Sequence, residues 1–183
     1  MATKIQIPLT DYFRLTHPRN VCLITADENI ITLAWTTPIS LNPPLFGISV
    51  GFTRTSYKLI KEAGDFGVNV PTMDMIDKVL YCGRHSGKKI NKFEKTGLTP
   101  IPATKIKAKL IKECIANFEC ELIDAQKYGD HGFFVGKVVA AGCEEGKYLF
   151  DQKRLQIEEL DLIYHIGGDF FCSNKNKVVS PKE

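Results

Sequence analysis

The stretch from Asn29 to Thr53, NIITLAWTTPISLNPPLFGISVGFT, most constrains how this chain can fold. It predicts two strands around a turn, because its first part is rich in β-branched and aromatic side chains and the corner Asn42-Pro43-Pro44 cannot belong to a central ladder. In the second strand large residues alternate with small ones: Phe46, Ile48, Val50 and Phe52 against Gly47, Ser49, Gly51 and Thr53. We expect the large residues to face the core. The small-residue face leaves room for a helix, another backbone, a partner subunit or a flat ligand.

Length and composition predict one domain over residues 1–183, large enough to bury a core, with a loose polar tail from 173 to 183. The chain is 44% hydrophobic and 25% charged, which is typical of a soluble protein. No apolar run approaches the roughly 18 residues of a membrane span, and the N-terminus lacks the apolar block of a secretory signal. We therefore expect a cytoplasmic protein without membrane contact.

Six cysteines occur without a CxxC pair, and four of them lie in apolar or strand-like runs. Buried free thiols in a reducing compartment explain this pattern better than disulfides do. Cys82 and His85 have a spacing seen in metal sites, but no second pair completes a set of ligands. The sequence therefore predicts no metal.

Charge is concentrated in one segment. The net charge is only +3, which argues against nucleic-acid binding, but residues 84–112 hold nine basic residues and one acidic residue. That segment carries +8, so the remainder carries −5. The segment either forms a solvated face or attracts a small phosphorylated ligand. The excess of positive charge is too local to bind a length of DNA.

The remaining patterns predict an antiparallel barrel with short helical connections. Further strands are expected at 21–25, 66–70, 110–125, 132–141 and 162–166, helices at 10–15, 55–63 and 74–81, and a long loop at 82–102. Thr55 is expected to cap its helix, and Gly64 to end it. The GxGxxG, GxxxxGK[ST], GxSxG and HExxH motifs are all missing from the sequence.

Four blocks, in order, resemble the flavin reductase-like, FMN-binding split-barrel proteins, particularly the flavoredoxin-like branch. They are Asn29 followed by TLAWTTPISLNPPL (32–45), GFTRTSYKLIKEAGDFGVNVP (51–71), SGKKINKF (86–93) and YGDHGFFVGKV (128–138). The resemblance spans about residues 8–170, which implies the extent of the domain core. The resemblance implies an all-β dominated fold, a six-stranded antiparallel Greek-key split barrel. It also implies a homodimer with one FMN per subunit at the interface.

The resemblance and the residue chemistry together nominate cofactor-binding positions. Backbone amides of Trp35, Thr36, Thr37 and Pro38 suit the polar edge of a flavin ring, although Trp35 fits a plain core aromatic equally well. The run Thr53, Arg54, Thr55 and Ser56 couples a guanidinium and hydroxyls to a predicted helix N-terminus, which favours a phosphate. The alternative is that Thr55 only caps the helix and Arg54 is solvated.

Three further places follow from the resemblance. Ser86, Lys92 and Phe93 match the family segment that closes over the phosphate or ribityl chain. His131 matches a position near the flavin, although a lone turn histidine is ordinarily a surface residue. Tyr164 and His165 are candidates for covering the ring from the far side.

The sequence offers no convincing catalytic triad, so we expect the chemistry to belong to the flavin and no catalytic side chain to be needed. The leading interpretation is an FMN-dependent oxidoreductase that takes hydride from NADH or NADPH and reduces flavin or ferric chelates. The alternative is a flavoredoxin-type electron carrier that accepts electrons from a protein partner. A split-barrel binding module without flavin is a third class, but it leaves the phosphate-like cluster unexplained.

Overall fold

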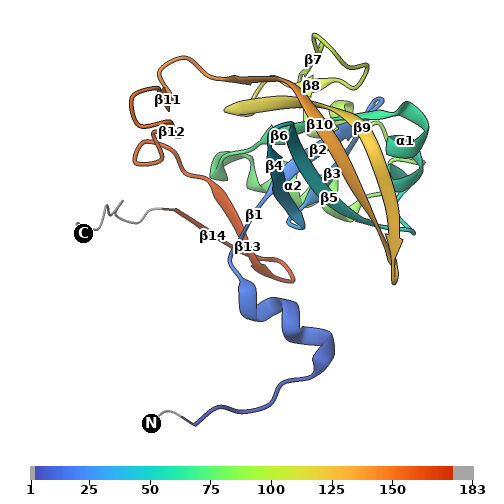
Figure 1. Cartoon of the computed structure of the whole chain (residues 1–183), viewed down its shortest axis with the longest axis vertical. Coiled ribbons are helices and arrows are strands. Elements are labelled where there is room, and N and C mark those ends of the chain that lie inside the picture. The colour runs from blue at the N-terminus through green and yellow to red at the C-terminus, as the bar shows by residue number, and fades with distance from the viewer. Residues whose placement is uncertain (1–2, 175–183) are drawn as a thin grey trace.

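The computed structural model describes residues 3–174 of the chain (Figure 1). Its main element is a seven-stranded antiparallel sheet. In spatial order its strands are β3 (Asn29–Leu33), β2 (Cys22–Ala26), β6 (Asp65–Val70), β9 (Ala116–Tyr128), β10 (His131–Cys143), β5 (Pro44–Gly51) and β4 (Thr36–Leu41).

The sheet curls back on itself because its two edge strands are consecutive in the chain. β3 ends at Leu33 and β4 begins at Thr36. Between them, the Trp35 carbonyl accepts a hydrogen bond from the Ser49 backbone N–H of β5 at 2.9 Å. The expected antiparallel, mostly β split barrel is therefore confirmed, while the large sheet contains seven strands where six were expected.

Smaller elements surround the barrel. The helices are the 3-10 helices η1 (Leu9–Thr16) and η2 (Met73–Met75), and α1 (Thr55–Ala63), α2 (Ile76–Arg84) and α3 (Lys92–Thr96). The short sheets are β1 (Arg19–Asn20) with β13 (Ile163–Gly167) and β14 (Phe170–Ser173), β7 (Pro100–Ile101) with β8 (Leu110–Ile111), and β11 (Tyr148–Leu149) with β12 (Arg154–Leu155). No helix within residues 3–174 is long and apolar enough to cross a membrane.

The core has two main parts, which share β2. Cys22, Ile24 and Ala26 belong to one cluster with the strands of the barrel and Ile60 of α1. Leu23 belongs to a second cluster that packs under α2, α3 and β13. Because β2 is buried on both faces, its sequence is apolar except for Thr25 and does not alternate.

The local patterns predict several elements well. The helix expected at 55–63 is α1, and Gly64 ends it in the left-handed conformation with φ of +73°. The Asn42-Pro43 corner is the turn between β4 and β5, where Leu41 pairs with Pro44. The buried free thiols are confirmed for Cys22, Cys82, Cys114 and Cys120, whereas Cys143 and Cys172 are half-buried.

Other expectations are wrong for local reasons. Thr55 does not cap α1, because Arg54 occupies the N-cap position without a side-chain cap bond. Phe52 lies beyond the end of β5 and is 37% exposed, so it is not core. The expected strand 110–125 begins only at Ala116, and its first two residues form β8. The expected loop 82–102 contains the end of α2 and the whole of α3.

Two buried carboxylates organise part of the basic segment. Glu119 accepts hydrogen bonds from the backbone N–H groups of Thr104, Lys105 and Ile106 at 2.6–3.2 Å. Asp65 accepts from Lys107 and Ala108 in the same way, at 3.0 and 3.2 Å. The irregular chain before β8 is thus held against β6 and β9. The C-terminal strand β14 includes Ser173, so the expected tail begins later, and residues 175–183 lie outside the described chain.

Candidate functional site

A polar pocket and a wider one meet beside the start of α1 and together form what we call the site groove. The polar end has a volume of about 80 Å³ and the wide end about 430 Å³. The two ends are continuous because they share Ile31, Thr53, Arg54 and Gly83 as lining residues.

The polar end is built around the N-terminus of α1, whose first backbone N–H groups have no partner within the helix. The Ser56 hydroxyl accepts a hydrogen bond from Asn29 Nδ2 at 2.7 Å, which leaves the hydroxyl proton free to donate elsewhere. The Thr55 and Ser86 hydroxyls lie 3.0 Å apart. Amides, hydroxyls and the Arg54 guanidinium thus converge on a small volume, which is suited to an anion.

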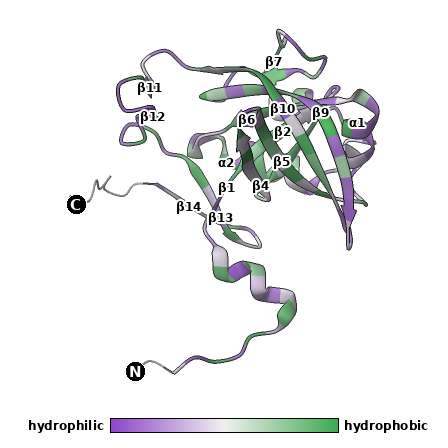
Figure 2. Cartoon of the chain, in the orientation of Figure 1, coloured by the Kyte–Doolittle hydropathy of each residue, from purple (hydrophilic) through white to green (hydrophobic). Residues whose placement is uncertain are grey.

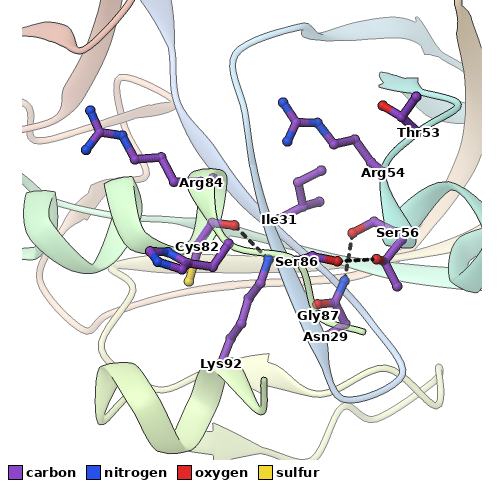
Figure 3. A pocket seen from close by; sticks show the side chains of 13 residues that line it. Asn29, Ile31, Thr53, Arg54, Ser56, Cys82, Arg84, Ser86, Gly87 and Lys92 are labelled. Carbon is purple, nitrogen blue, oxygen red and sulfur yellow. Dashed lines mark hydrogen bonds between the residues drawn. The ribbon is translucent and has the colours of Figure 1, made fainter. Parts of the chain in front are cut away.

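Lys92 enters this end from α3, opposite the side on which Arg54 and Arg84 extend (Figure 3). Its Nζ donates to the Ile30 carbonyl at 2.5 Å and to the Cys82 carbonyl at 2.7 Å. Burial lowers the pKa of Lys92, although the neighbouring Cys82 opposes this shift. An ammonium has three protons, so one remains to face the pocket after two carbonyls are satisfied.

One buried acceptor at the polar end has no donor within the described chain. Asn29 Oδ1 is buried without a hydrogen bond, and Asn29 lines the pocket. Gly87 packs directly against it, because a Cβ there would overlap that oxygen. A ligand hydroxyl or N–H would remove the cost of this unpaired acceptor. The polar end therefore combines an anion-binding group with an acceptor that a hydroxylated chain would satisfy.

The wide end has aromatic and small side chains. The Trp35 and His131 rings stack with centroids 4.9 Å apart and planes 29° apart. Ser49 and Gly51 of β5 line the same end and project little beyond the backbone. The small-residue face of β5 is thus divided, since Gly47 is covered by Phe133 and Ile39 of this chain while Ser49 and Gly51 border the site groove.

His131 is held at the tip of the β9–β10 hairpin. Its Nδ1 lies 2.6 Å from Asp130 Oδ1. The hydrogen bond and the charge of His131 lower the pKa of Asp130. The turn before it contains Gly129, with φ of +56°, a conformation that glycine adopts without strain. The hairpin thereby places an acid–imidazole pair beside Trp35.

Eight of the predicted cofactor-binding residues line the site groove. They are Trp35, Thr53, Arg54, Thr55, Ser56, Ser86, Lys92 and His131. The other five lie outside its walls. Thr36, Thr37 and Pro38 belong to β4 and pair with β5, Phe93 belongs to the core beneath α2, and Tyr164 packs against a separate cluster of Ile115, Leu160 and Leu162.

Several lining residues were not predicted. Asn29 begins the first block of the family resemblance, but it was not named as a site residue, and the sequence does not show that it faces α1. Gly83 was assigned to a loop, but in α2 it lets the helix approach β3, since a Cβ there would lie 3.3 Å from Thr32. His165, which was named with Tyr164 as a candidate cover for the ring, does line the wide end, whereas Tyr164 packs in a separate cluster.

Comparison with known proteins agrees with this fold. The model of the flavin reductase like domain matches residues 13–159. A protein of Pyrococcus abyssi is 31% identical over 170 residues, covering 91% of this chain and 96% of its own. A flavin reductase of Pseudomonas putida is 28% identical over 159 residues, covering 83% of this chain and 82% of its own.

Solved structures give the same picture. The flavoredoxin from Methanosarcina acetivorans is 29% identical, with a TM-score of 0.85 over 98% of this chain and 95% of its own. An FMN-binding protein from Thermus thermophilus is 25% identical, with a TM-score of 0.83 over 99% of both chains. The chain belongs to the flavin reductase-like family of flavoproteins.

Proposed function

We propose that the chain binds FMN in the site groove and works as an NAD(P)H-dependent oxidoreductase of the flavin or ferric-chelate reductase type. The observation that carries the proposal is the continuity of an anion-binding end with a wider aromatic end. The polar end takes the phosphate, Asn29 Oδ1 accepts from a ribityl hydroxyl, and the wide end takes the ring. When bound, the flavin supplies the hydride and electron chemistry.

In this proposal the side chains bind and orient. Arg54 forms the planar clamp for the phosphate, helped by Ser56, Ser86 and the free amides of α1. Trp35 and His131 border the ring, and Asp130 holds the imidazole through Nδ1. Thr36, Thr37, Pro38 and Tyr164, which lie outside the walls of the site groove, are assigned no contact with the ring.

The first test identifies the ligand. The polar end has room for one phosphate and the sequence carries no dinucleotide fingerprint, so FMN and not FAD is expected. Mass spectrometry of the ligand released from purified protein by heat should give FMN alone. A stoichiometric FAD signal would contradict the proposal.

The second test addresses the phosphate contact. Arg54→Ala should weaken FMN binding roughly ten- to a hundred-fold, because charge-assisted hydrogen bonds contribute about 1.5–3 kcal/mol. Riboflavin lacks the phosphate, so its affinity should barely change. Arg154→Ala, which removes a surface guanidinium paired with Glu158, is the matched control and should alter neither affinity. An unchanged FMN-to-riboflavin ratio in Arg54→Ala would overturn the assignment.

The third test separates the enzyme from a flavoredoxin-type carrier. The FMN-loaded protein should bleach within seconds of anaerobic mixing with NADH or NADPH if it is a reductase. Unchanged colour that responds only to a reduced protein partner would favour the carrier, a candidate supported by the likeness to a flavoredoxin. We also propose a homodimer, of about 1,200–2,000 Å² total interface, and a cytoplasmic location.

A further inference from the structure

A third cavity, which we call the side lobe, opens from the wide end of the site groove towards α2 and the β13–β14 hairpin. Its volume is about 250 Å³. It shares Thr32, Ala34, Arg54, Gly83 and His165 with the wide end, so a molecule in the side lobe lies against whatever fills that end. At about 30 Å³ per water, this space equals roughly eight waters. The side lobe therefore suits one small ring with a short substituent.

The floor of the side lobe is apolar. Val21 and Val79 belong to the second core cluster, and Ala34 and Phe171 pack against that cluster. Leu80 of α2 completes this surface. Figure 2 shows that the β13–β14 hairpin, which supplies Phe171, carries both hydrophobic and hydrophilic residues where it lies beside β1. A ligand with an apolar body is stabilised here because the floor removes that body from water.

Most polar side chains around the side lobe already have partners. The Thr32 hydroxyl donates to a backbone carbonyl of α2 at 2.5 Å, and His165 Nε2 donates to the Gly168 carbonyl at 2.9 Å. Among the lining side chains within residues 3–174, the donors that remain for a ligand are the guanidinium groups of Arg54 and Arg84. A nucleotide or sugar would leave several hydroxyls on an apolar floor, and each unpaired group is costly. The side lobe therefore favours a ligand with one anionic group.

A carboxylate already occupies one of these guanidinium groups. Arg84, the last residue of α2, forms an ion pair with Asp169 in the turn between β13 and β14. Both side chains are more than half exposed, at 52 and 61%, and an exposed ion pair contributes little to stability. Arg54, Arg84 and Asp169 are the charged lining residues, so the side lobe carries a net charge of +1 when His165 is neutral. A ligand carboxylate can therefore replace Asp169 on Arg84 at low cost.

We propose that the side lobe binds a small monocarboxylate with an apolar body, of the size of benzoate, as a second ligand beside the flavin. The carboxylate takes the place of Asp169 on Arg84, and the apolar body lies on the floor between α2 and Phe171. Because Arg84 holds the carboxylate, Arg54 remains available for the phosphate at the polar end. The contact of this ligand with the flavin ring rests on the proposed function, whereas its binding to the side lobe does not.

Calorimetric titration with benzoate at saturating FMN tests the exchange of carboxylates. Arg84→Gln should weaken benzoate binding roughly five-fold or more, because the ligand loses its charge-assisted hydrogen bonds. Asp169→Asn should have the opposite effect and tighten binding about two- to five-fold, because the competing carboxylate is gone. Arg154→Gln and Glu158→Gln open another surface ion pair, so they are the matched controls and should leave the affinity unchanged. Equal affinities of the wild type, Arg84→Gln and Asp169→Asn would overturn the proposal.

The choice of probe tests the chemistry of the ligand. Benzoate should bind more tightly than acetate, which lacks the apolar body, and more tightly than benzyl alcohol, which lacks the charge. Inorganic phosphate that bound as tightly as benzoate, with the same dependence on Arg84, would assign the side lobe to a phosphorylated ligand and contradict the proposal.

Flavin-free protein separates this proposal from the proposed function. Benzoate in the side lobe should bind both with and without FMN, and in the FMN-loaded protein it should perturb the visible absorption of the flavin. Benzoate that binds only without FMN lies in the wide end, which would overturn the side lobe as its site. Protein that binds benzoate through Arg84 but does not bind FMN would contradict the proposed function and support the side lobe. FMN binding without benzoate binding would contradict the side lobe alone.

Discussion

Lys92 has a structural role in addition to lining the site groove. Its side chain is 3% exposed, and its two carbonyl partners belong to β3 and α2. A buried ammonium is costly unless hydrogen bonds compensate for lost hydration. The sequence resemblance pointed to a phosphate contact, whereas the structure adds a role in joining α3 to the barrel.

We therefore predict that Lys92→Met destabilises the protein even without ligand. The Ile30 and Cys82 carbonyls lose their donor, and each buried unpaired acceptor costs about 1–3 kcal/mol. Lys95→Met on the exposed face of the same helix should change the free energy of unfolding by less than about 0.5 kcal/mol. Urea unfolding of both variants without flavin measures the difference. Equal stability of the two would show that Lys92 acts only on the ligand.

The lowered pKa of Glu119 makes the stability of the fold depend on pH. Burial raises its pKa, but the hydrogen bonds from the 104–106 backbone outweigh burial, so the pKa lies below its ordinary value. Because the folded pKa is below the unfolded one, the carboxylate's contribution is complete above the unfolded pKa of about 4.3. The contribution is lost as pH falls through the folded pKa.

Glu119→Gln should therefore lower stability at pH 7 by roughly 1–3 kcal/mol and flatten the loss of stability below about pH 4.3. The control is Glu121→Gln, because Glu121 is exposed two residues along the same strand. This variant should lose stability below about pH 4.3 as the wild type does. Melting temperatures measured from pH 3 to 7 give both curves. If Glu119→Gln lost stability at low pH as steeply as the wild type, the Glu119 carboxylate would not be the cause of that loss.

At the scale of elements, close packing between β10 and β5 explains why β5 needs glycine. An added Cβ at Gly47 would lie 2.5 Å from the Phe133 ring. We predict that Gly47→Ala lowers stability by about 1–3 kcal/mol through overpacking, and that adding Phe133→Leu recovers part of it. Gly142→Ala in β10 meets nothing within 4 Å and is the control. A melting temperature for Gly47→Ala that falls only at low protein concentration would instead place a partner at this face.

Elements whose signals are local were predictable from the sequence. The apolar spacing of Ile60 and the stop at Gly64 are contained within nine or ten residues, and α1 has the expected bounds. The start of β9 was misplaced because Leu110 and Ile111 have the apolar character of a strand. The structure shows that they form the separate strand β8, which pairs with β7. The segment 82–102 is rich in polar residues, so its pattern did not predict α3. In the structure the Asn91 side chain caps this helix, and Lys92 bonds to the Ile30 carbonyl of β3.

The site was only partly predictable, for a related reason. The phosphate-like cluster at Arg54 and Ser56 is contiguous in sequence, so a motif was visible. Asn29 joins it through a hydrogen bond across 27 residues, and Gly83 joins it through the packing of α2 on β3. Such partners depend on tertiary pairing, which a single sequence does not display. The assignment of residues 1–183 to one domain stays a prediction.

At the scale of the whole molecule, the site groove depends on nearly every part of the barrel. Its lining residues come from β3, β5, α1, α2, α3, the β9–β10 hairpin and β13, spanning Asn29 to His165. No fragment of the chain holds the two ends together, so a ligand that fills the groove binds the folded state and not the unfolded chain. Binding must then stabilise the entire fold by mass action.

We predict that FMN at 100 times its dissociation constant raises the free energy of unfolding by about 2.7 kcal/mol in a single cooperative transition. At a fixed concentration, riboflavin should stabilise less, because it leaves Arg54 and the α1 amides without a phosphate. In Arg54→Ala the advantage of FMN over riboflavin should shrink. Melting without ligand should stay near wild type, because Arg54 bonds to Gly51 and Tyr57 through its backbone, which the substitution keeps. Calorimetry at several flavin concentrations measures this. If FMN shifted only part of the transition, the groove would belong to a sub-region that folds separately from the barrel.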